Sequence, residues 1–426
     1  MSVDRDDSGT GARCEAVSGG LAGPEPQVRV GIACGGTGGH LFPGMAVGEL
    51  LRSRGARVTL FVSPKEVDQR AVRGLGGMEV EVLPVAAWQA GSRWACLVGA
   101  VRSWGRVRRS MGCQAGWVVL GMGGFSSVPV LAAARWTGHP VFLHESNAVP
   151  GRANRWLVRW VDRAFVGFED AGRAWVGRSV EWTGTPVRPA FAEAGALSVE
   201  QRQQRRRRVL AELGLDPGAP TVLVVGGSQG ARGLNDAVLA SLPLWRERLP
   251  GLQWIHLTGP QDEDRVRAGY VAHRLRAAVM AFSEAMADLL LGATVVLSRA
   301  GGSFLAELAA VRVPAVLVPF PAAADDHQWH NARLYAEAGA ARVLRQWEAT
   351  PEQLVHQLRG LLEDGSARAA LCEAQRRWHR PDAAQRIADV LLETARRQWA
   401  TAGADAGRTR ARGWDGWTRT RAARMG

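Results

Sequence analysis

The sequence feature that most constrains the fold is a short apolar run followed directly by a glycine turn, which occurs once in each half of the chain. The first turn, residues 35–39, follows the apolar run 28–34, and the second turn, residues 226–230, follows the run 221–225. Both turns share the pattern G-G-[ST]-x-G. Apolar runs of this length next to glycines are typical of buried parallel strands. In a chain of 426 residues, two copies so far apart predict two Rossmann-like domains.

Further strands are predicted in both halves, each ending in a polar or glycine-containing loop. They cover residues 57–62, 117–120, 141–143, 253–257, 294–297 and 314–318. Parallel strands end at one edge of a sheet, and ligands of open α/β sheets bind at that edge. We therefore predict an α/β fold in which two parallel-sheet domains face each other across a cleft.

The expected domain boundaries are the positions at which the alternation of strands, loops and helices begins, stops and begins again. It comprises a tail (1–27), an N-terminal domain (28–189), an interdomain region (190–219), a C-terminal domain (220–385) and a C-terminal helix with a basic tail (386–426). The charged run 201–208 in the interdomain region is predicted to form the solvated face of a helix.

Charge and cysteine content limit the partners and the compartment. With 53 Lys and Arg residues against 40 Asp and Glu residues, the chain has a net charge of +13 and is expected to attract polyanions. Lys65 is the only lysine and 17 tryptophans are present, so a GC-rich genome and a selected membrane or nucleic-acid surface explain the composition equally well. Five cysteines without a C-x-x-C pair argue against a disulfide framework or a thiolate metal site, and suit a reducing compartment.

Neither a signal peptide nor a transmembrane helix is expected. Residues 1–13 have neither the cationic start nor the apolar core of a signal peptide. Residues 111–134 carry no charged side chain and are long enough to cross a bilayer. Glycines and Pro129 in the middle of this stretch instead predict a strand, a glycine loop and a new helix.

Three glycine loops are candidate phosphate sites. Residues 35–39, 226–230 and 299–303 each precede a predicted helix, whose first N–H groups lack intrahelical acceptors and bind anions. One such loop often serves only strand-to-helix packing, but three in equivalent places favour a phosphate compound. The first loop lacks the Lys-Ser/Thr end of a P-loop and has Leu41 where a dinucleotide fingerprint needs its third glycine, which disfavours ATPase and redox functions.

Three side chains near predicted strand ends or glycine loops are candidates for chemistry. His40 ends the first loop and could be a general base or only a hydrogen-bonding residue. Glu145, at the mouth of another strand, is a second candidate base. Glu307, a few residues beyond the third loop, could accept bonds from both ribose hydroxyls of a nucleotide or simply favour a helix N-terminus.

The polar run 325–328, together with His330, has two possible roles. Its Asp and His side chains could bind a metal, but no second pair of ligands is visible in the sequence. The preferred interpretation is an aspartate N-cap on a helix that directs His327 or Gln328 toward a polar ligand. No metal site is therefore predicted.

These segments together resemble the UDP-N-acetylglucosamine--N-acetylmuramyl-(pentapeptide) pyrophosphoryl-undecaprenol N-acetylglucosamine transferases, the bacterial enzymes that make lipid II for peptidoglycan. The resemblance covers residues 28 to about 343 and rests on ordered motifs at residues 35–40, 121–124, 144–147, 185–188, 226–231, 298–301 and 326–332. The chain has Ser146 where the family usually has Gln. The N-terminal tail and the arginine-rich residues 408–424 have no counterpart in the resemblance.

The resemblance implies a GT-B fold and an inverting transfer from UDP-N-acetylglucosamine (UDP-GlcNAc) to lipid I, with no cofactor required. His40 or Glu145 would be the catalytic base. The implied substrate-binding residues are Thr37, Gly38, Gly39, Asn147, Arg188, Ser228, Gln229, Gly230, Ser283, Gly301, Gly302, Ser303, Phe304, Leu305, Ala306, Glu307, His327 and Gln328.

Some of these residues have a more specific implied role. The first loop would also lie near the acceptor pyrophosphate, and Ser228 would contact the donor diphosphate. The backbone near Ser283 would meet the uracil, Glu307 the ribose and Gln328 the sugar hydroxyls. Asn147 and Arg188 would reach the sugar nucleotide across the cleft.

The resemblance also implies a peripheral location at the cytoplasmic leaflet of the membrane and no nucleic-acid partner. A patch at the membrane surface could be formed by Trp88, Trp94, Trp104, Trp156 and Trp160 with Arg93, Arg102, Arg106, Arg152 and Arg155, although core tryptophans are an equal alternative. Three other functions stay open: a UDP-GlcNAc 2-epimerase, a transferase for another lipid or glycoside acceptor, and a non-catalytic nucleotide-sugar sensor.

Overall fold

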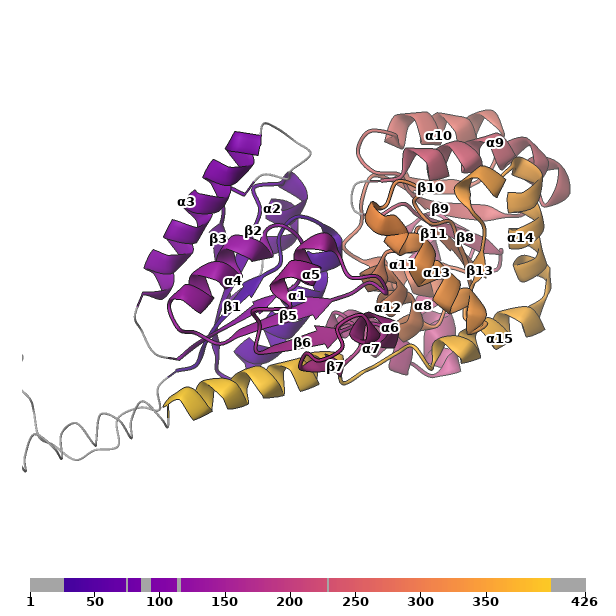
Figure 1. Cartoon of the computed structure of the whole chain (residues 1–426). Coiled ribbons are helices and arrows are strands. Elements are labelled where there is room, and N and C mark those ends of the chain that lie inside the picture. The colour runs from indigo at the N-terminus through magenta and orange to yellow at the C-terminus, as the bar shows by residue number, and fades with distance from the viewer. Residues whose placement is uncertain (1–26, 74–75, 86–92, 113–115, 228–229, 400–426) are drawn as a thin grey trace, which may run out of the picture.

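The chain forms two α/β domains that lie side by side, as the computed structural model in Figure 1 shows. The structure describes residues 27–73, 76–85, 93–112, 116–227 and 230–399. The predictions for the N-terminal tail, the arginine-rich C-terminal end, Trp88, Ser228 and Gln229 therefore concern residues outside the described ranges. The α/β prediction is confirmed, because each domain is built on one parallel sheet.

The first sheet contains seven parallel strands in the order β3-β2-β1-β4-β5-β6-β7. The strands are β1 (Arg29–Ala33), β2 (Arg57–Val62), β3 (Glu79–Val82), β4 (Trp117–Gly121), β5 (Val141–Glu145), β6 (Arg163–Val166) and β7 (Val180–Trp182). The helices are α1 (Gly38–Ser53), α2 (Glu66–Val72), α3 (Arg93–Met111), α4 (Ser127–Trp136), α5 (Arg152–Leu157) and α6 (Glu169–Arg173). Apolar side chains of α1 cover one face of the sheet, and those of α3 and α4 cover the other.

The second sheet contains six parallel strands in the order β10-β9-β8-β11-β12-β13. The strands are β8 (Thr221–Val225), β9 (Gln253–Leu257), β10 (Ala277–Met280), β11 (Val295–Ser298), β12 (Ala315–Leu317) and β13 (Arg342–Val343). The helical segments are α9 (Arg232–Arg248), α10 (Glu263–Ala272), α11 (Met286–Gly292), α12 (Gly302–Val311), η1 (Ala324–Asp326), α13 (His327–Glu337), η2 (Gln346–Glu348), α14 (Pro351–Glu363) and α15 (Gly365–Gln375). β1 and β8, which precede the two matching glycine turns, occupy equivalent central positions in their sheets.

The interdomain region forms α7 (Pro189–Ala196) and α8 (Val199–Glu212), which pack on the second sheet. The charged run in α8 is only partly a solvated face. Arg208 is exposed and pairs with Glu212, whereas Arg206 is half-buried and donates to the backbone oxygens of Ala219, at 3.0 Å, and Gly292. The prediction was wrong for Arg206 because its guanidinium donates to carbonyls at the end of α11 and in the turn before β8.

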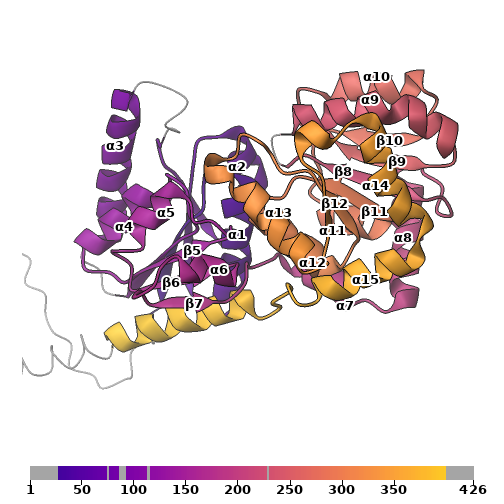
Figure 2. The same ribbon diagram turned by 45° about the vertical axis from the view of Figure 1, so that its right-hand side comes forward.

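A helix at residues 383–399 returns to the first domain and covers its sheet on the same face as α1 (Figures 1 and 2). Ile387, Leu391 and Leu392 of this helix are buried in the core of the first domain. Arg386 also donates two hydrogen bonds, of 3.0 and 2.6 Å, to the Glu181 carboxylate in β7. The chain therefore crosses between the domains twice, which ties both ends of the second domain to the first.

Two local predictions are corrected by the helix and strand ends. Pro43, shortly after the first glycine turn, favours the first turn of a helix from the sequence alone. However, α1 already begins at Gly38, because Thr37 is extended and its carbonyl accepts the His40 and Leu41 N–H groups. Pro43 therefore lies inside the helix. Strand β5 continues through Glu145 rather than ending at Leu143, so the carboxylate belongs to a strand end and not to a loop.

The uncharged stretch 111–134 behaves as predicted, with strand β4, a glycine loop and the start of α4 in its described part. Within the described ranges, no helix combines the length and apolarity needed to cross a bilayer.

Candidate functional site

A cavity of about 520 Å³ lies between the two domains at the carboxyl edges of both sheets. The first glycine turn contributes Thr37, Gly38 and Gly39, and the second contributes Gly226 and Gly227. The third loop reaches the same cavity at the start of α12. The prediction that the glycine turns face one shared cleft is confirmed, and the volume lies in the range of small-molecule sites.

Most of the predicted site residues line this cavity. They are Thr37, Gly38, Gly39, His40, Glu145, Asn147, Arg188, Ser283, Gly301, Gly302, Ser303, Phe304, Glu307, His327 and Gln328. The Leu305 side chain does not line the cavity, because it is fully buried in the core of the second domain. Ala306 and Gly230 also lie outside the cavity lining, and a Cβ on Gly230 would meet the Thr258 carbonyl at 2.3 Å.

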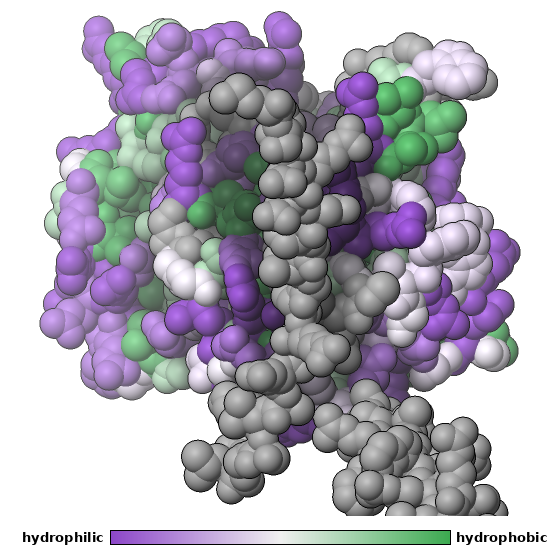
Figure 3. Space-filling view, turned by 90° about the vertical axis from the view of Figure 1, so that its left-hand side faces the viewer, coloured by the Kyte–Doolittle hydropathy of each residue, from purple (hydrophilic) through white to green (hydrophobic). Residues whose placement is uncertain are grey.

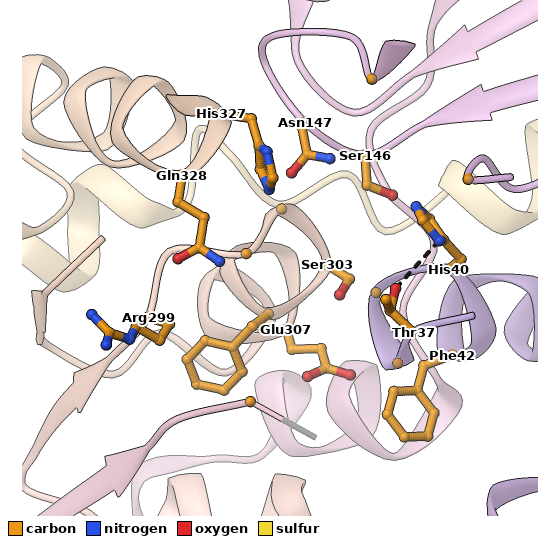
Figure 4. Close-up of a pocket in the computed structure, with 18 of the residues that line it drawn as sticks. Thr37, His40, Phe42, Ser146, Asn147, Arg299, Ser303, Glu307, His327 and Gln328 are labelled. Atoms are coloured by element: carbon orange, nitrogen blue, oxygen red, sulfur yellow. Dashed lines mark hydrogen bonds between the residues drawn. The ribbon is translucent and has the colours of Figure 1, made fainter. Parts of the chain in front are cut away.

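His40 lies in the first turn of α1, where its ring faces the cavity (Figure 4). Its Nδ1 is 3.2 Å from the Thr37 hydroxyl, which leaves Nε2 as the nitrogen free to exchange a proton. Burial lowers the pKa of His40 to about 4, opposed by the negative charge of Asp68. The imidazole is therefore neutral at physiological pH and can accept a proton.

The Glu145 carboxylate is occupied by hydrogen bonds at both oxygens. Oε1 accepts from the backbone N–H and the side-chain amide of Asn147 at 2.9 and 3.0 Å, and Oε2 accepts from Gly151 N and Asn154 Nδ2 at 2.9 and 2.8 Å. Burial raises its pKa, and these four bonds oppose the rise. Because every lone-pair direction has a donor, Glu145 shapes the loop after β5, and His40 is the better candidate base.

The buried Glu307 and the half-buried Arg188 form an ion pair in the cavity lining. The Arg188 Nη2 is 3.6 Å from the Glu307 carboxylate, and its guanidinium lies over the ring of Phe42 in α1, 4.3 Å from the centroid. Burial raises the pKa of Glu307 to about 7, and Arg188 opposes the rise. The carboxylate is therefore close to half ionised at neutral pH in the unliganded site.

Gln328 and His327 enter the cavity from the start of α13 (Figure 4). The Gln328 Oε1 accepts from the backbone N–H groups of Ala300, at 3.2 Å, and Phe320, at 3.0 Å. This fixes the side chain so that its amide nitrogen points into the cavity (Figure 4). Asp326 holds the predicted N-cap position of α13, but its backbone is left-handed and its side chain makes no capping hydrogen bond.

A neutral seam joins the domains beside the cavity. Asn331 of α13 accepts from Ala148 N at 2.8 Å and donates to the Asn147 side-chain oxygen at 3.0 Å. The backbones also meet closely, because a Cβ on Gly302 would lie 2.0 Å from the Ser146 carbonyl oxygen. Asn147 is thus engaged in joining the domains, which constrains how it can meet a ligand.

Two residues not singled out by the sequence hold the first glycine turn in place. The Gly36 N–H donates to the Asp68 carboxylate at 2.7 Å, and the Gly36 carbonyl accepts from the Lys65 ammonium at 2.8 Å. Asp68 is fully buried. Both residues follow the end of β2, which lies beside β1 at the same sheet edge, and this position is the one sequence feature that points to the site. Neither residue belongs to a glycine pattern.

We predict that Gly302→Ala separates the domains at the seam. The added Cβ must displace the Ser146 carbonyl, which should lower stability by about 1–3 kcal/mol and increase the radius of gyration of the ligand-free protein. Thermal unfolding and small-angle X-ray scattering measure both effects. Gly301→Ala is the matched control, because among the described residues no heavy atom lies within 4 Å of its Cβ position. Equal behaviour of the two variants would contradict the close approach.

Comparison with known proteins places the chain in one family. Residues 30–166 match the N-terminal domain and residues 221–387 the C-terminal domain of glycosyltransferase family 28. A UDP-N-acetylglucosamine--N-acetylmuramyl-(pentapeptide) pyrophosphoryl-undecaprenol N-acetylglucosamine transferase from Sorangium cellulosum is 38% identical, over 87% of this chain and 89% of its own length. The protein of the same name from Halorhodospira halophila is 39% identical, over 86% and 98%.

A solved structure agrees with these relatives. MurG from Acinetobacter baumannii is 26% identical to this chain, with a TM-score of 0.64 over 86% of this chain and 100% of MurG. The match confirms the two-domain GT-B fold expected from the sequence. By sequence and by fold, this chain belongs to the UDP-GlcNAc-dependent N-acetylglucosamine transferases of glycosyltransferase family 28.

Proposed function

We propose that this chain transfers N-acetylglucosamine from UDP-GlcNAc to the C4 hydroxyl of the N-acetylmuramoyl sugar of lipid I, which gives lipid II. The main supporting observation is that His40 of the first domain and the Glu307 and Gln328 side chains of the second line one cavity. The relatives' shared name supports the transferase over the 2-epimerase alternative.

The donor is proposed to bind along the second domain. Its diphosphate would meet the N–H groups at the starts of α9 and α12, where helix N-termini favour negative charge. Glu307 would accept both ribose hydroxyls, and the loop at Ser283 would meet the uracil. The Gln328 amide, held by Ala300 and Phe320, would donate to a sugar hydroxyl.

The acceptor is proposed to enter from the first domain, with its pyrophosphate at the first glycine turn. The C4 hydroxyl attacks the anomeric carbon, His40 Nε2 takes the hydroxyl proton, and UDP leaves from the opposite face with inversion. Main-chain amides stabilise the charge that develops on the leaving diphosphate. The Lys65 and Asp68 bonds to Gly36 hold the first turn rigid for this alignment.

The transfer itself is testable with radiolabelled UDP-GlcNAc and a short-chain lipid I analogue. Label is expected in the lipid fraction, and His40→Ala should lower kcat by roughly 10²–10⁴-fold because proton removal is lost. His356→Ala, an exposed histidine of α14, is the control and should keep full activity. Epimerisation of UDP-GlcNAc without acceptor would instead support the epimerase, and binding without any turnover would support the sensor.

A pH dependence of donor binding follows from Glu307. Its pKa of about 7 means that the carboxylate is mostly protonated at pH 6 and mostly ionised at pH 8, and the ionised form is the better acceptor for ribose hydroxyls. The dissociation constant for UDP-GlcNAc should therefore fall by up to about tenfold from pH 6 to pH 8. Calorimetry on Glu307→Gln should show a flat profile; a wild-type slope retained in the variant would assign the titration to another group.

We further propose that α3 rests on the membrane surface that carries the acceptor. Trp94 is 75% exposed, and Leu97 and Val101 lie on the same exposed side of the helix. The α3 sequence contains five arginines and no Asp or Glu, which suits anionic lipid. Figure 3 looks onto this side of the molecule, where apolar and hydrophilic side chains lie together.

The patch differs from the one predicted from the sequence. Trp94, Trp156 and Trp160 are exposed as the patch requires, whereas Trp104 is half-buried against Trp136. Arg152 and Arg155 pair with Asp325 of the second domain, and Arg106 pairs with Glu81.

Val101→Glu should reduce sedimentation with vesicles of phosphatidylcholine and phosphatidylglycerol about fivefold or more, because a charge replaces an inserting apolar side chain. Val271→Glu in α10 is the control, since Val271 is 71% exposed against 59% for Val101. Binding of the wild-type protein should also weaken with salt. Equal sedimentation of both variants would exclude α3 as the contact.

A further inference from the structure

An ion pair crosses the mouth of the cleft, separate from the neutral seam. The Asp325 carboxylate, in the loop between β12 and α13, accepts from Arg152 at 3.1 Å and from Arg155. Both arginines belong to α5 of the first domain. Asp325 is an exposed residue, and its side chain, which meets the two guanidinium groups, is 27% exposed.

The backbone of this loop adopts an uncommon conformation. Asp325 and Asp326 have φ values of 52° and 51°, so two successive non-glycine residues are left-handed. Such residues persist only where surrounding contacts hold them, and they concentrate at ligand sites and switches. The bonds from Arg152 and Arg155 are contacts that hold Asp325 in this position.

The loop ends directly at the two side chains that enter the cavity. His327 is the first residue of α13, and its Nδ1 donates a hydrogen bond to the Ala324 carbonyl oxygen, 2.8 Å away. Gln328 follows directly. Because only two residues separate Asp325 from Gln328, a shift of the Asp325 loop changes where the Gln328 amide points. The Gln328 Oε1 accepts hydrogen bonds from the Ala300 and Phe320 N–H groups, and these bonds fix the side chain relative to the second domain.

We propose that Asp325 is a positioning residue for the donor sugar: its ion pairs with Arg152 and Arg155 hold the start of α13 against the first domain, so that Gln328 is in place before UDP-GlcNAc binds. This rests on the proposed function, which assigns Gln328 to the sugar hydroxyls. When a site is already in its binding conformation, none of the binding free energy is needed to rearrange it, so the affinity is higher. The charged pair shares no residue with the buried Asn331 and Gly302 contacts that join the domains.

The test compares affinities for UDP-GlcNAc and for UDP, measured by calorimetry on the full chain without acceptor. Asp325→Asn should weaken UDP-GlcNAc binding about three- to tenfold and change UDP binding less than twofold, because the loop serves the sugar and not the nucleotide. Asp170→Asn is the matched control, since Asp170 pairs with Arg173 within the first domain and should leave both affinities unchanged.

A double-mutant cycle assigns the effect to the ion pair. Arg155→Gln should weaken UDP-GlcNAc binding as well, and the Arg155→Gln/Asp325→Asn double variant should be no worse than Asp325→Asn. The difference between Asp325→Asn and the wild-type protein should shrink at high salt. Equal losses for UDP and UDP-GlcNAc, additive losses in the cycle, or an Asp325→Asn variant that binds like Asp170→Asn would each overturn the proposal.

The outcome is distinguishable from a failure of the proposed function. If the wild-type protein binds neither UDP nor UDP-GlcNAc, the donor assignment itself is wrong. If the sugar-specific loss is found but no label reaches the lipid I analogue, the positioning role stands and only the acceptor is wrong.

Discussion

The structure depends on one constraint: helix N-termini carry N–H groups without intrahelical acceptors, and parallel sheets collect these termini at one edge. Each domain alone offers such an edge. Because the two edges face each other, the glycine turns of both domains line the same cavity and can share one ligand rich in negative charge. The rest of the fold holds these two edges on opposite sides of one cavity of about 520 Å³.

That spacing is held by contacts of three different kinds. The chain crosses between the domains twice, and the helix at residues 383–399 buries apolar side chains in the first domain, so the domains cannot drift apart. Asn331 and Gly302 bring the backbones together at a neutral seam whose hydrogen bonds are insensitive to salt. Asp325 adds a charged contact at the rim, which salt or a variant can weaken while the seam remains.

The sequence predicts the strands, the two domains and most of the cavity lining, because those follow from local patterns of apolar runs and glycines. It fails where the deciding contact is distant in sequence. Leu305 follows the third loop but points into the core, and Pro43 is placed by the extended Thr37 rather than by its own preference for a first turn. Lys65 and Asp68 show no motif of their own, since their importance comes only from the position of β2 beside β1.

The electrostatics of His40 indicate how the reaction is driven. In the unliganded site burial lowers its pKa to about 4, so on its own it is a weak base for a sugar hydroxyl. Negative charge beside an imidazole raises its pKa, as Asp68 already does here, and both proposed substrates bring phosphates to loops next to His40. The substrates would thus strengthen the base that acts on them. In the proposed mechanism, His40 is neutral in the empty cleft, and bound phosphates would favour its protonation when the hydroxyl loses its proton.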